Sequence, residues 1–531
     1  MAAMQADSHN PSKANTQIAR AAGTVMAAFV VSNLVGLLAK TLTAREFGTS
    51  IDSNAFFAAN RFSEILFNLV AGGALGSAFI PVFTGLLAAE AKQKAWKLAS
   101  AIANLVSIVL LGLSLLAFFF APHVVRLILA PGFSPEASAL TASLLRVQVI
   151  SSIIFGLSGL VMGILNSHQR FLLPAIAPAM YQFGWILGIY LLRPALGIFG
   201  LAWGVVIGSL LHLLVQLPSL LKLPHRAYQP SLGLDMPEVR EVGRLMAPRL
   251  LGVAIVQLNF LLNTLLASFQ PAGSITAISL AFPLMIMPEA ALAQSIAIAA
   301  LPTFAAQVAR KQFSEMRASL SAALRVMLLL AVPASIGLIL LRRPIVELLY
   351  QGNQFSANST DLVAWALLFY ALGLIGHGLV EILSRAFYAL HDTKTPVLIG
   401  VGAMSLNLVM SFLFVWLFRI WKLMPHGGLA LANSAATLIE SAILLVLMRK
   451  RLSGLEETKL VISFIKALFA GAGMAAVILL LNAYVRLPGR MANAALAVAL
   501  GMLSYGLLLV LLRTEELKRI FGLLRERLAR R

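Results

Sequence analysis

The chain has 531 residues, of which 60% are hydrophobic and 12% are charged, and its mean hydropathy is +0.89. A soluble domain is closer to half apolar and a quarter charged, so this composition excludes an ordinary soluble protein and indicates a polytopic membrane protein. The net charge of +20 lies mainly in short loops and the C-terminal tail, which is typical of the positive-inside rule and argues against nucleic acid as a partner.

Apolar runs of about 20 residues, bounded by charged residues, proline or glycine, predict an all-α membrane protein with about 14 spanning helices. Loops that follow the even-numbered spans hold most of the lysine and arginine, so we expect these loops and both termini to face the cytoplasm. The predicted spans lie at 21–44, 55–86, 97–121, 138–166, 171–193, 198–221, 243–269, 275–307, 319–341, 360–388, 396–418, 428–448, 461–484 and 491–512.

A repeat of about 220 residues runs through the chain. Four short matches recur in the same order at nearly one shift, which predicts two six-helix repeats. Because each repeat has an even number of membrane spans, both copies cross the membrane in the same direction. Two such lobes that rock against each other suit alternating access better than a rigid pore or a structural scaffold. The matches are Phe133-Ser134 with Phe355-Ser356, Ile80-Pro81-Val82-Phe83 with Leu301-Pro302-Thr303-Phe304, His168 with His391, and Gly200-Leu201-Ala202 with Gly428-Leu429-Ala430.

The repeat divides the chain into six segments. The two lobes are expected at 21–222 and 243–450, and the last two helices, in 451–512, fall outside the repeat. Residues 1–20 are polar and lack the features of a cleaved signal, so we expect a disordered cytoplasmic N-terminus. The remaining segments are a cytoplasmic linker and a basic cytoplasmic tail, at 223–242 and 513–531.

Several motifs in this order resemble the MurJ/MviN family of the multidrug/oligosaccharidyl-lipid/polysaccharide exporter superfamily. The resemblance covers roughly residues 20–450. It is carried by NAFFAANRF at 54–62, GGALGSAFIPVF at 72–83, LAPGF at 129–133, ILNSHQRFLLPAIAP at 164–178, FLLNTLLASF at 260–269 and FYALHDTKTP at 387–396.

This resemblance implies a flippase that moves lipid II, the undecaprenyl-diphosphate-linked peptidoglycan precursor, from the inner to the outer leaflet of the bacterial cytoplasmic (inner) membrane. The implied fold is two six-helix lobes, with residues 451–512 forming a groove for the lipid tail. The expected partners are this lipid, membrane lipids and the cell-wall synthesis machinery, and we expect a monomer. No cofactor is expected, although coupling to Na⁺, H⁺ or the membrane potential follows from the family.

The chain departs from the family's pattern at several positions, most of which carry charged residues in the family. Arginines that would hold a diphosphate are replaced by other residues, which keeps a second hypothesis open: a flippase for another polyprenyl-linked oligosaccharide. A cation-coupled drug exporter of the same superfamily and a non-transporting membrane partner are further alternatives. The replacements are Asn33, Ala39-Lys40, Asn54, Phe62-Ser63-Glu64, Phe67-Asn68 and Phe282-Pro283.

Charged side chains within the spans are candidates for the headgroup site, because a diphosphate needs cations. Lys40 occupies the family's charged patch, or else it reaches the membrane interface. Arg61 and Glu64 lie three residues apart, so Arg61 is either a headgroup ligand tuned by Glu64 or half of a structural ion pair. Arg249, after Pro248, is a headgroup ligand or an interface anchor.

Polar residues of the seventh span extend this hypothesis. Asn259 and Asn263 share one face of the predicted helix. They are expected either to contact the sugar or peptide of the headgroup or to make hydrogen bonds between helices.

Acidic residues in the second lobe are candidates for coupling. Glu289 follows Pro288 and has no cation near it in sequence, so we expect it to bind a proton or another cation. Glu381 lies four residues before Arg385, a spacing that favours a structural ion pair. Glu440 is a weaker candidate.

No enzyme motif is present. The sequence has no P-loop, no G-x-S-x-G motif, no metal-binding helix and no cysteine, which predicts a transporter that hydrolyses no ATP itself. His168 and His391 are isolated, so they do not predict a metal site. Asp392 is expected to cap the helix that begins near Pro396.

Overall fold

The computed structural model describes residues 11–70, 74–485, 490–514 and 516. The described residues are helical with short connections, and they divide into two compact units, Met1–Ala272 and Gly273–Arg531. Twelve helical segments are long and apolar enough to cross a membrane. The other two predicted spans correspond to α1 and to α2 with α3, so the prediction of an all-α polytopic membrane protein is confirmed.

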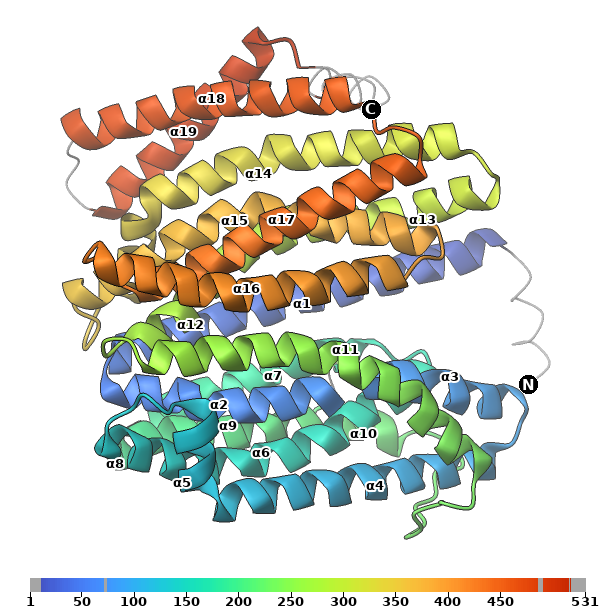
Figure 1. Cartoon of the computed structure of the whole chain (residues 1–531). Helices are drawn as coiled ribbons and strands as arrows, with labels where there is room; N and C mark the ends of the chain where they lie inside the picture. The colour runs from blue at the N-terminus through green and yellow to red at the C-terminus, as the bar shows by residue number, and fades with distance from the viewer. Residues whose placement is uncertain (1–10, 71–73, 486–489, 515, 517–531) are drawn as a thin grey trace. The chain divides into compact units, whose positions relative to one another are not determined.

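The first unit contains six of the predicted spans and the helix that begins the second repeat (Figure 1). Helix α6 lies among α2, α4 and α9, while α7 packs on α9 and on α1. Helix α11 packs on α3 and α2. The helices are α1 (Pro11–Phe47), α2 (Ile51–Val70), α3 (Ala74–Ala88), α4 (Lys92–Phe119), α5 (Ala121–Val124), the π-helix η2 (Val125–Leu129), α6 (Pro135–Ser167), α7 (Leu172–Leu187), the π-helix η3 (Gly188–Leu192), α8 (Arg193–Leu196), α9 (Ile198–Leu214), α10 (Leu217–Leu221) and α11 (Pro237–Ser268).

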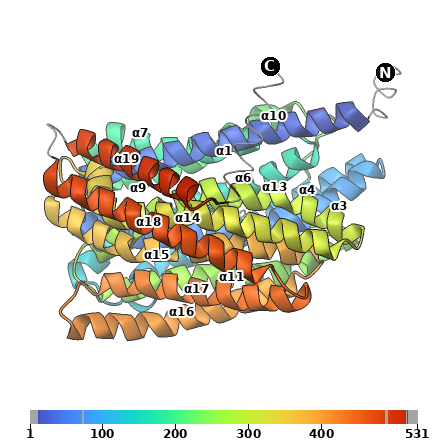
Figure 2. The ribbon, with the colours of Figure 1, turned by 90° about the horizontal axis from the view of Figure 1, so that it is seen from above.

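The second unit repeats this packing order. Helix α15 lies among α12, α14 and α17. Helix α16 packs on α17, and the two are seen side by side in Figure 2. The last two helices, α18 and α19, pack on each other and on α14. The helices are α12 (Ser274–Glu289), the π-helix η4 (Ala290–Gln294), α13 (Ser295–Ala309), α14 (Phe313–Tyr350), α15 (Ala357–Ala389), α16 (Lys394–Ile420), α17 (His426–Arg451), α18 (Glu457–Tyr484) and α19 (Arg490–Leu511).

The two loops that hold the repeated Phe-Ser pairs have the same local structure. Ser134 precedes α6, and its side chain accepts a hydrogen bond from the amide of Ala137. Ser356 precedes α15 and accepts the equivalent bond from Ser359. A serine at this position supplies an acceptor for an otherwise unpaired amide of the first turn. The repeated Phe-Ser pair is therefore a repeated helix start.

The other repeated motifs also have matching roles. Phe83 and Phe304 are fully buried, at 0% and 1% exposure, in the cores of their units. Gly200 and Gly428 each lie against the backbone of the preceding span, so that an added Cβ would be less than 3.0 Å from main-chain atoms. These glycines allow a close approach of two helices, which any larger residue would prevent.

Three boundaries differ from the sequence prediction. Residues 11–20, which were expected to be disordered, belong to α1, while 1–10 and most of the tail lie outside the described residues. The first compact unit ends at Ala272 and so takes in α11, whereas the repeat placed the lobe boundary before residue 243. The predicted span 275–307 is interrupted after Glu289 by η4, because Pro283 and Pro288 remove backbone donors from α12.

Candidate functional site

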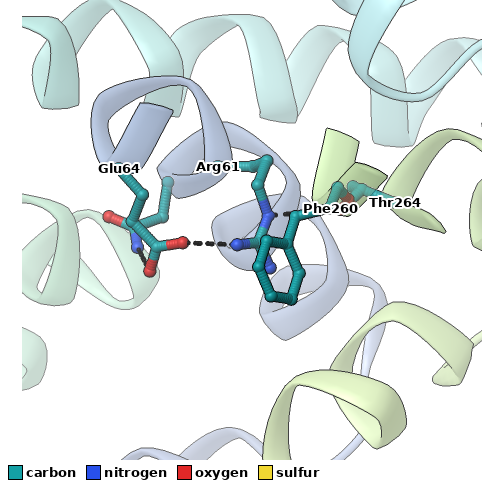
Figure 3. A network of polar contacts seen from close by, with 5 residues as sticks. Arg61, Glu64, Phe260 and Thr264 are labelled. Atoms are coloured by element: carbon teal, nitrogen blue, oxygen red, sulfur yellow. Dashed lines mark hydrogen bonds and ion pairs between the residues drawn. The ribbon is translucent and has the colours of Figure 1, made fainter. Parts of the chain in front are cut away.

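An ion pair on α2 forms the centre of a polar cluster in the first unit (Figure 3). Arg61 Nη1 donates to Glu64 Oε2 at 2.7 Å, and Asn60 Nδ2 donates to Glu64 Oε1 at 2.8 Å. All three residues lie within one helical turn, so the helix itself brings them together. The side chains of Arg61 and Glu64 are 20% and 40% exposed, so the pair remains accessible from one side.

Helix α11 holds the other side of the Arg61 guanidinium. Thr264 Oγ1 accepts a hydrogen bond from Arg61 Nε at 3.3 Å, and the guanidinium carbon lies 5.4 Å from the centre of the Phe260 ring. Figure 3 shows the guanidinium between Glu64 and these two residues. The Nη2 atom of Arg61 has no hydrogen-bond partner among the described residues. Arg61 is therefore oriented on three sides and retains free donors.

Lys40 on α1 contributes a second positive charge to this cluster. It is half-buried and interacts electrostatically with both Glu64 and Arg61. It makes no hydrogen bond or ion pair with any residue that the structure describes. Lys40 and Arg61 lie on consecutive helices, α1 and α2, and the fold brings both side chains to one site with Glu64.

The remaining predicted headgroup residues lie along α11. Asn259 and Asn263 are half-buried and each precedes, by one position, a residue that contacts Arg61. Arg249 lies exposed, about four helical turns before Thr264, where the residues described offer it no partner. The two asparagines are therefore next in the chain to residues that contact Arg61, and Arg249 lies outside the cluster.

Phe67, where the resemblance implied an arginine, is a packing side chain. Its ring lies against that of Phe155, with the ring centres 4.4 Å apart and the planes tilted by 52°, and its centre is 6.2 Å from that of the His212 ring. His212 belongs to a buried network in which its Nδ1 lies 2.6 Å from Ser158 Oγ, and Gln216 Nε2 donates to the same hydroxyl at 2.8 Å. Sequence analysis missed this network because α6 and α9 meet only in the folded chain.

A second charged cluster lies in the second unit around η4. Glu289 is only 4% exposed, and its Oε2 accepts a hydrogen bond from Gln294 Nε2 at 3.1 Å. Glu381 interacts electrostatically with Glu289 and is paired with Arg385 at 2.7 Å. The predicted Glu381–Arg385 pair is therefore confirmed. Gln294 was not predicted, because the π-helix that turns its side chain toward Glu289 has no clear signal in sequence.

Glu440, the weaker acidic candidate, lies on α17 facing α16. Its Oε1 lies 3.3 Å from the position that a Cβ would take at Gly400. No cation or hydrogen-bond donor among the described residues pairs with it. It is separate from the Glu289 cluster.

An apolar cavity of about 570 Å³ lies beside α14, α18 and α19 in the second unit. Its wall is almost entirely hydrophobic, and Pro288 brings the cavity next to the Glu289 turn. Hydrophobic walls of this size suit an alkyl or prenyl chain. Residues that line it include Leu338, Met474, Ile478, Met502 and Tyr505.

Known proteins resemble this chain over most of its length. The family model described as "Lipid II flippase MurJ" matches residues 43–514. The chain is 32% identical to the lipid II flippase MurJ of Burkholderia cenocepacia over 81% of its own length and 84% of that protein. It is 28% identical to the probable lipid II flippase MurJ of Vibrio cholerae, over 79% and 81% of the two chains.

Solved structures give the same result. A lipid II flippase MurJ in an inward closed conformation matches with a TM-score of 0.79 and 25% identity, covering 92% of this chain and 98% of that one. A multidrug transporter of the MATE family matches with a TM-score of 0.67 at 15% identity, over 81% of this chain and 95% of that chain, which shows a shared fold only. The chain belongs to the lipid II flippase MurJ family.

Proposed function

We propose that this chain moves lipid II from the inner to the outer leaflet of the bacterial cytoplasmic membrane by alternating access, as a step in peptidoglycan biosynthesis. The observation that carries this proposal is the match to the MurJ family over residues 43–514. The internal repeat supports the mechanism, because two similar lobes that run in the same direction suit alternating access.

The headgroup site is built around Arg61 and Lys40. Arg61 offers free guanidinium donors, and Lys40 has no counter-ion within hydrogen-bonding distance among the described residues. Both groups suit the two phosphates of a lipid diphosphate. Asn259 and Asn263, beside them on α11, supply amides for the sugar or peptide, and the exposed Arg249 contacts anionic headgroups further along the helix.

The lipid tail is accommodated beside the last two helices. The apolar cavity of about 570 Å³ along α14, α18 and α19 supports this assignment. A prenyl chain bound in this cavity stays in an apolar environment at the depth of the membrane. The polar headgroup crosses separately, along polar side chains of the protein.

Coupling of transport to Na⁺, H⁺ or the membrane potential involves the Glu289 turn. Glu289 is nearly fully buried, has a π-helix directly after it, and lies in electrostatic reach of Glu381. Two acidic groups in the membrane favour a bound cation or proton. Arg385 already neutralises the charge of Glu381, so only the charge of Glu289 remains to be balanced by a cation or a proton.

The chain functions as a monomer, with both termini in the cytoplasm, and works with the cell-wall synthesis machinery. The lysine and arginine of the loops after even-numbered spans support this orientation.

Complementation tests the proposed function. The chain would be expressed in a bacterium depleted of its own MurJ, and lysis and the accessibility of lipid II at the outer leaflet would be followed. Growth with accessible lipid II is the expected result. Folded and inserted protein without rescue would refute it and favour another polyprenyl-linked oligosaccharide, for which the replaced arginines at Asn33, Ala39 and Phe67 are the supporting observation.

A further inference from the structure

We propose that Glu64 is a built-in counter-ion of the headgroup site, and that binding of a lipid diphosphate displaces it from Arg61 with uptake of one proton by the Glu64 carboxylate. This inference rests on the proposed function, since it requires that a diphosphate binds at Arg61 and Lys40. It adds that substrate binding and protonation are linked within this chain.

The geometry shows that Glu64 already occupies the place of an anionic ligand. One carboxylate oxygen accepts from Arg61 Nη1 at 2.7 Å and the other from Asn60 Nδ2 at 2.8 Å. Phosphate oxygens seek the same short, charge-assisted contacts with guanidinium donors. Glu64 is the more exposed member of the pair, at 40% against 20% for Arg61. Its carboxylate can therefore leave while Arg61 stays fixed on Thr264 and Phe260.

Charge balance then determines what happens to Glu64. Lys40 and Arg61 carry two positive charges and the ionised Glu64 carries one negative charge, so the free cluster has a net charge of +1. A lipid diphosphate diester carries two negative charges. Binding it beside an ionised Glu64 would bring three negative charges against two positive ones in a membrane, where unbalanced charge is costly. With Glu64 protonated, the two positive charges match the two phosphates.

The surroundings of Glu64 offer no other neutralising group. Lys40 and Arg61 are the two cations in its electrostatic environment within the described structure, and both are needed for the diphosphate. Among the other elements packed on α2, η2 carries the exposed Arg126, and α9 carries His212, which lies about one turn further along α2 against Phe67. The proton therefore comes from solvent. The groups that interact with Glu64 are Asn60 and Arg61 of α2, Lys40 of α1 and Tyr181 of α7. Phe260 and Thr264 of α11 contact its partner Arg61.

Asn60 can form a hydrogen bond with Glu64 in both its ionised and its protonated state. Its amide can present either its oxygen or its nitrogen to the carboxyl group, so it donates to the ionised form and can accept from the protonated one. Asn60 Oδ1 is buried and has no hydrogen-bond partner among the described residues. Rotation of the amide by half a turn would bring this oxygen to a protonated Glu64, so the same side chain can serve both states.

The experiment is a calorimetric titration of the purified full-length protein with lipid II in buffers that differ in ionisation enthalpy. The dependence of the apparent binding enthalpy on the buffer gives the number of protons taken up. We expect about one proton for the wild type, with the dissociation constant rising about tenfold per unit of pH where the uptake is complete. Glu64→Gln, which mimics the neutral acid, should bind more tightly than wild type, with no proton uptake and no pH dependence.

Glu347→Gln is the matched control. Glu347 pairs with Arg343 at 3.2 Å in the second unit and has no role in the headgroup site. It should retain the wild-type affinity and proton uptake. Binding of lipid II by wild type without proton uptake would overturn the inference alone, as would weaker binding by folded Glu64→Gln. Failure of folded wild type to bind lipid II would remove the proposed function and the inference with it.

Discussion

Replacing Arg61 with alanine tests the headgroup site most directly. The change removes three contacts: the 2.7 Å ion pair with Glu64, the 3.3 Å hydrogen bond to Thr264 and the stacking on Phe260. Because the ion pair is partly exposed, its loss should lower the free energy of unfolding by only about 1 kcal/mol or less. The loss of a charge-assisted hydrogen bond to phosphate should instead weaken binding by about 1.5–3 kcal/mol.

That free energy corresponds to a loss of affinity for lipid II of about 10- to 150-fold at a nearly unchanged unfolding temperature. The assay is titration of lipid II into the purified variant, combined with complementation of MurJ-depleted cells. Arg61→Lys should give an intermediate affinity, because lysine keeps the charge but cannot reproduce the planar contacts to Phe260 and Thr264.

Arg146→Ala is the control for this experiment. Arg146 makes contacts of the same kind outside the site: its Nε donates to the carbonyl of Phe118 at 3.2 Å, and its guanidinium lies 5.9 Å from the centre of the Phe118 ring. It should bind lipid II as wild type does. Equal losses for the two alanine variants, or wild-type binding by Arg61→Ala, would refute the assignment of Arg61 to the headgroup site.

Three further predictions concern other parts of the chain. Glu516→Ala removes the carboxylate that pairs with the buried Arg325 at 3.1 Å, the two side chains being 9% and 5% exposed, so we expect a loss of stability of at most about 3–5 kcal/mol; an unchanged unfolding temperature in detergent would contradict this. Glu289→Gln should abolish the dependence of flipping on pH or on the coupling cation in proteoliposomes, and an unaltered dependence would exclude Glu289 as the coupling acid. Hydrogen bonds from the amide and hydroxyl of Thr395 hold the pKa of Asp392 below its ordinary value of 3.8. This contribution to stability is present above that value and is lost as the pH falls through the lowered pKa. Asp392→Asn should therefore be less stable than wild type at neutral pH and equally stable in strong acid, as measured by thermal unfolding, and a constant difference across pH would contradict the reasoning.

The resemblance implies arginine at the positions of Asn33, Ala39 and Phe67, whereas Phe67 packs in an aromatic cluster with Phe155. Positive charge in this part of the chain is supplied by Lys40 and Arg61. Because an intramembrane charge is costly unless it is used or paired, this arrangement favours a rebuilt anion site over a decayed one.

The sequence by itself determined those features that depend on local periodicity. Runs of apolar residues predicted the membrane helices, because a segment that crosses a bilayer must form its backbone hydrogen bonds within itself. The repeat placed a Phe-Ser pair at equivalent points before two of the predicted spans, and the Arg61–Glu64 and Glu381–Arg385 pairs followed from spacings of three and four residues on one helix.

Only the tertiary structure decided which helices bring their polar groups together. Thr264 reaches Arg61 across about 200 residues of chain, and Lys40 joins the same cluster from α1. The packing of α11 with the first unit and the π-helix that turns Gln294 to Glu289 were likewise absent from the sequence pattern. The physical reason is that helix–helix packing in a membrane is set by close contacts between small groups and hydrogen bonds, which carry no fixed spacing in sequence.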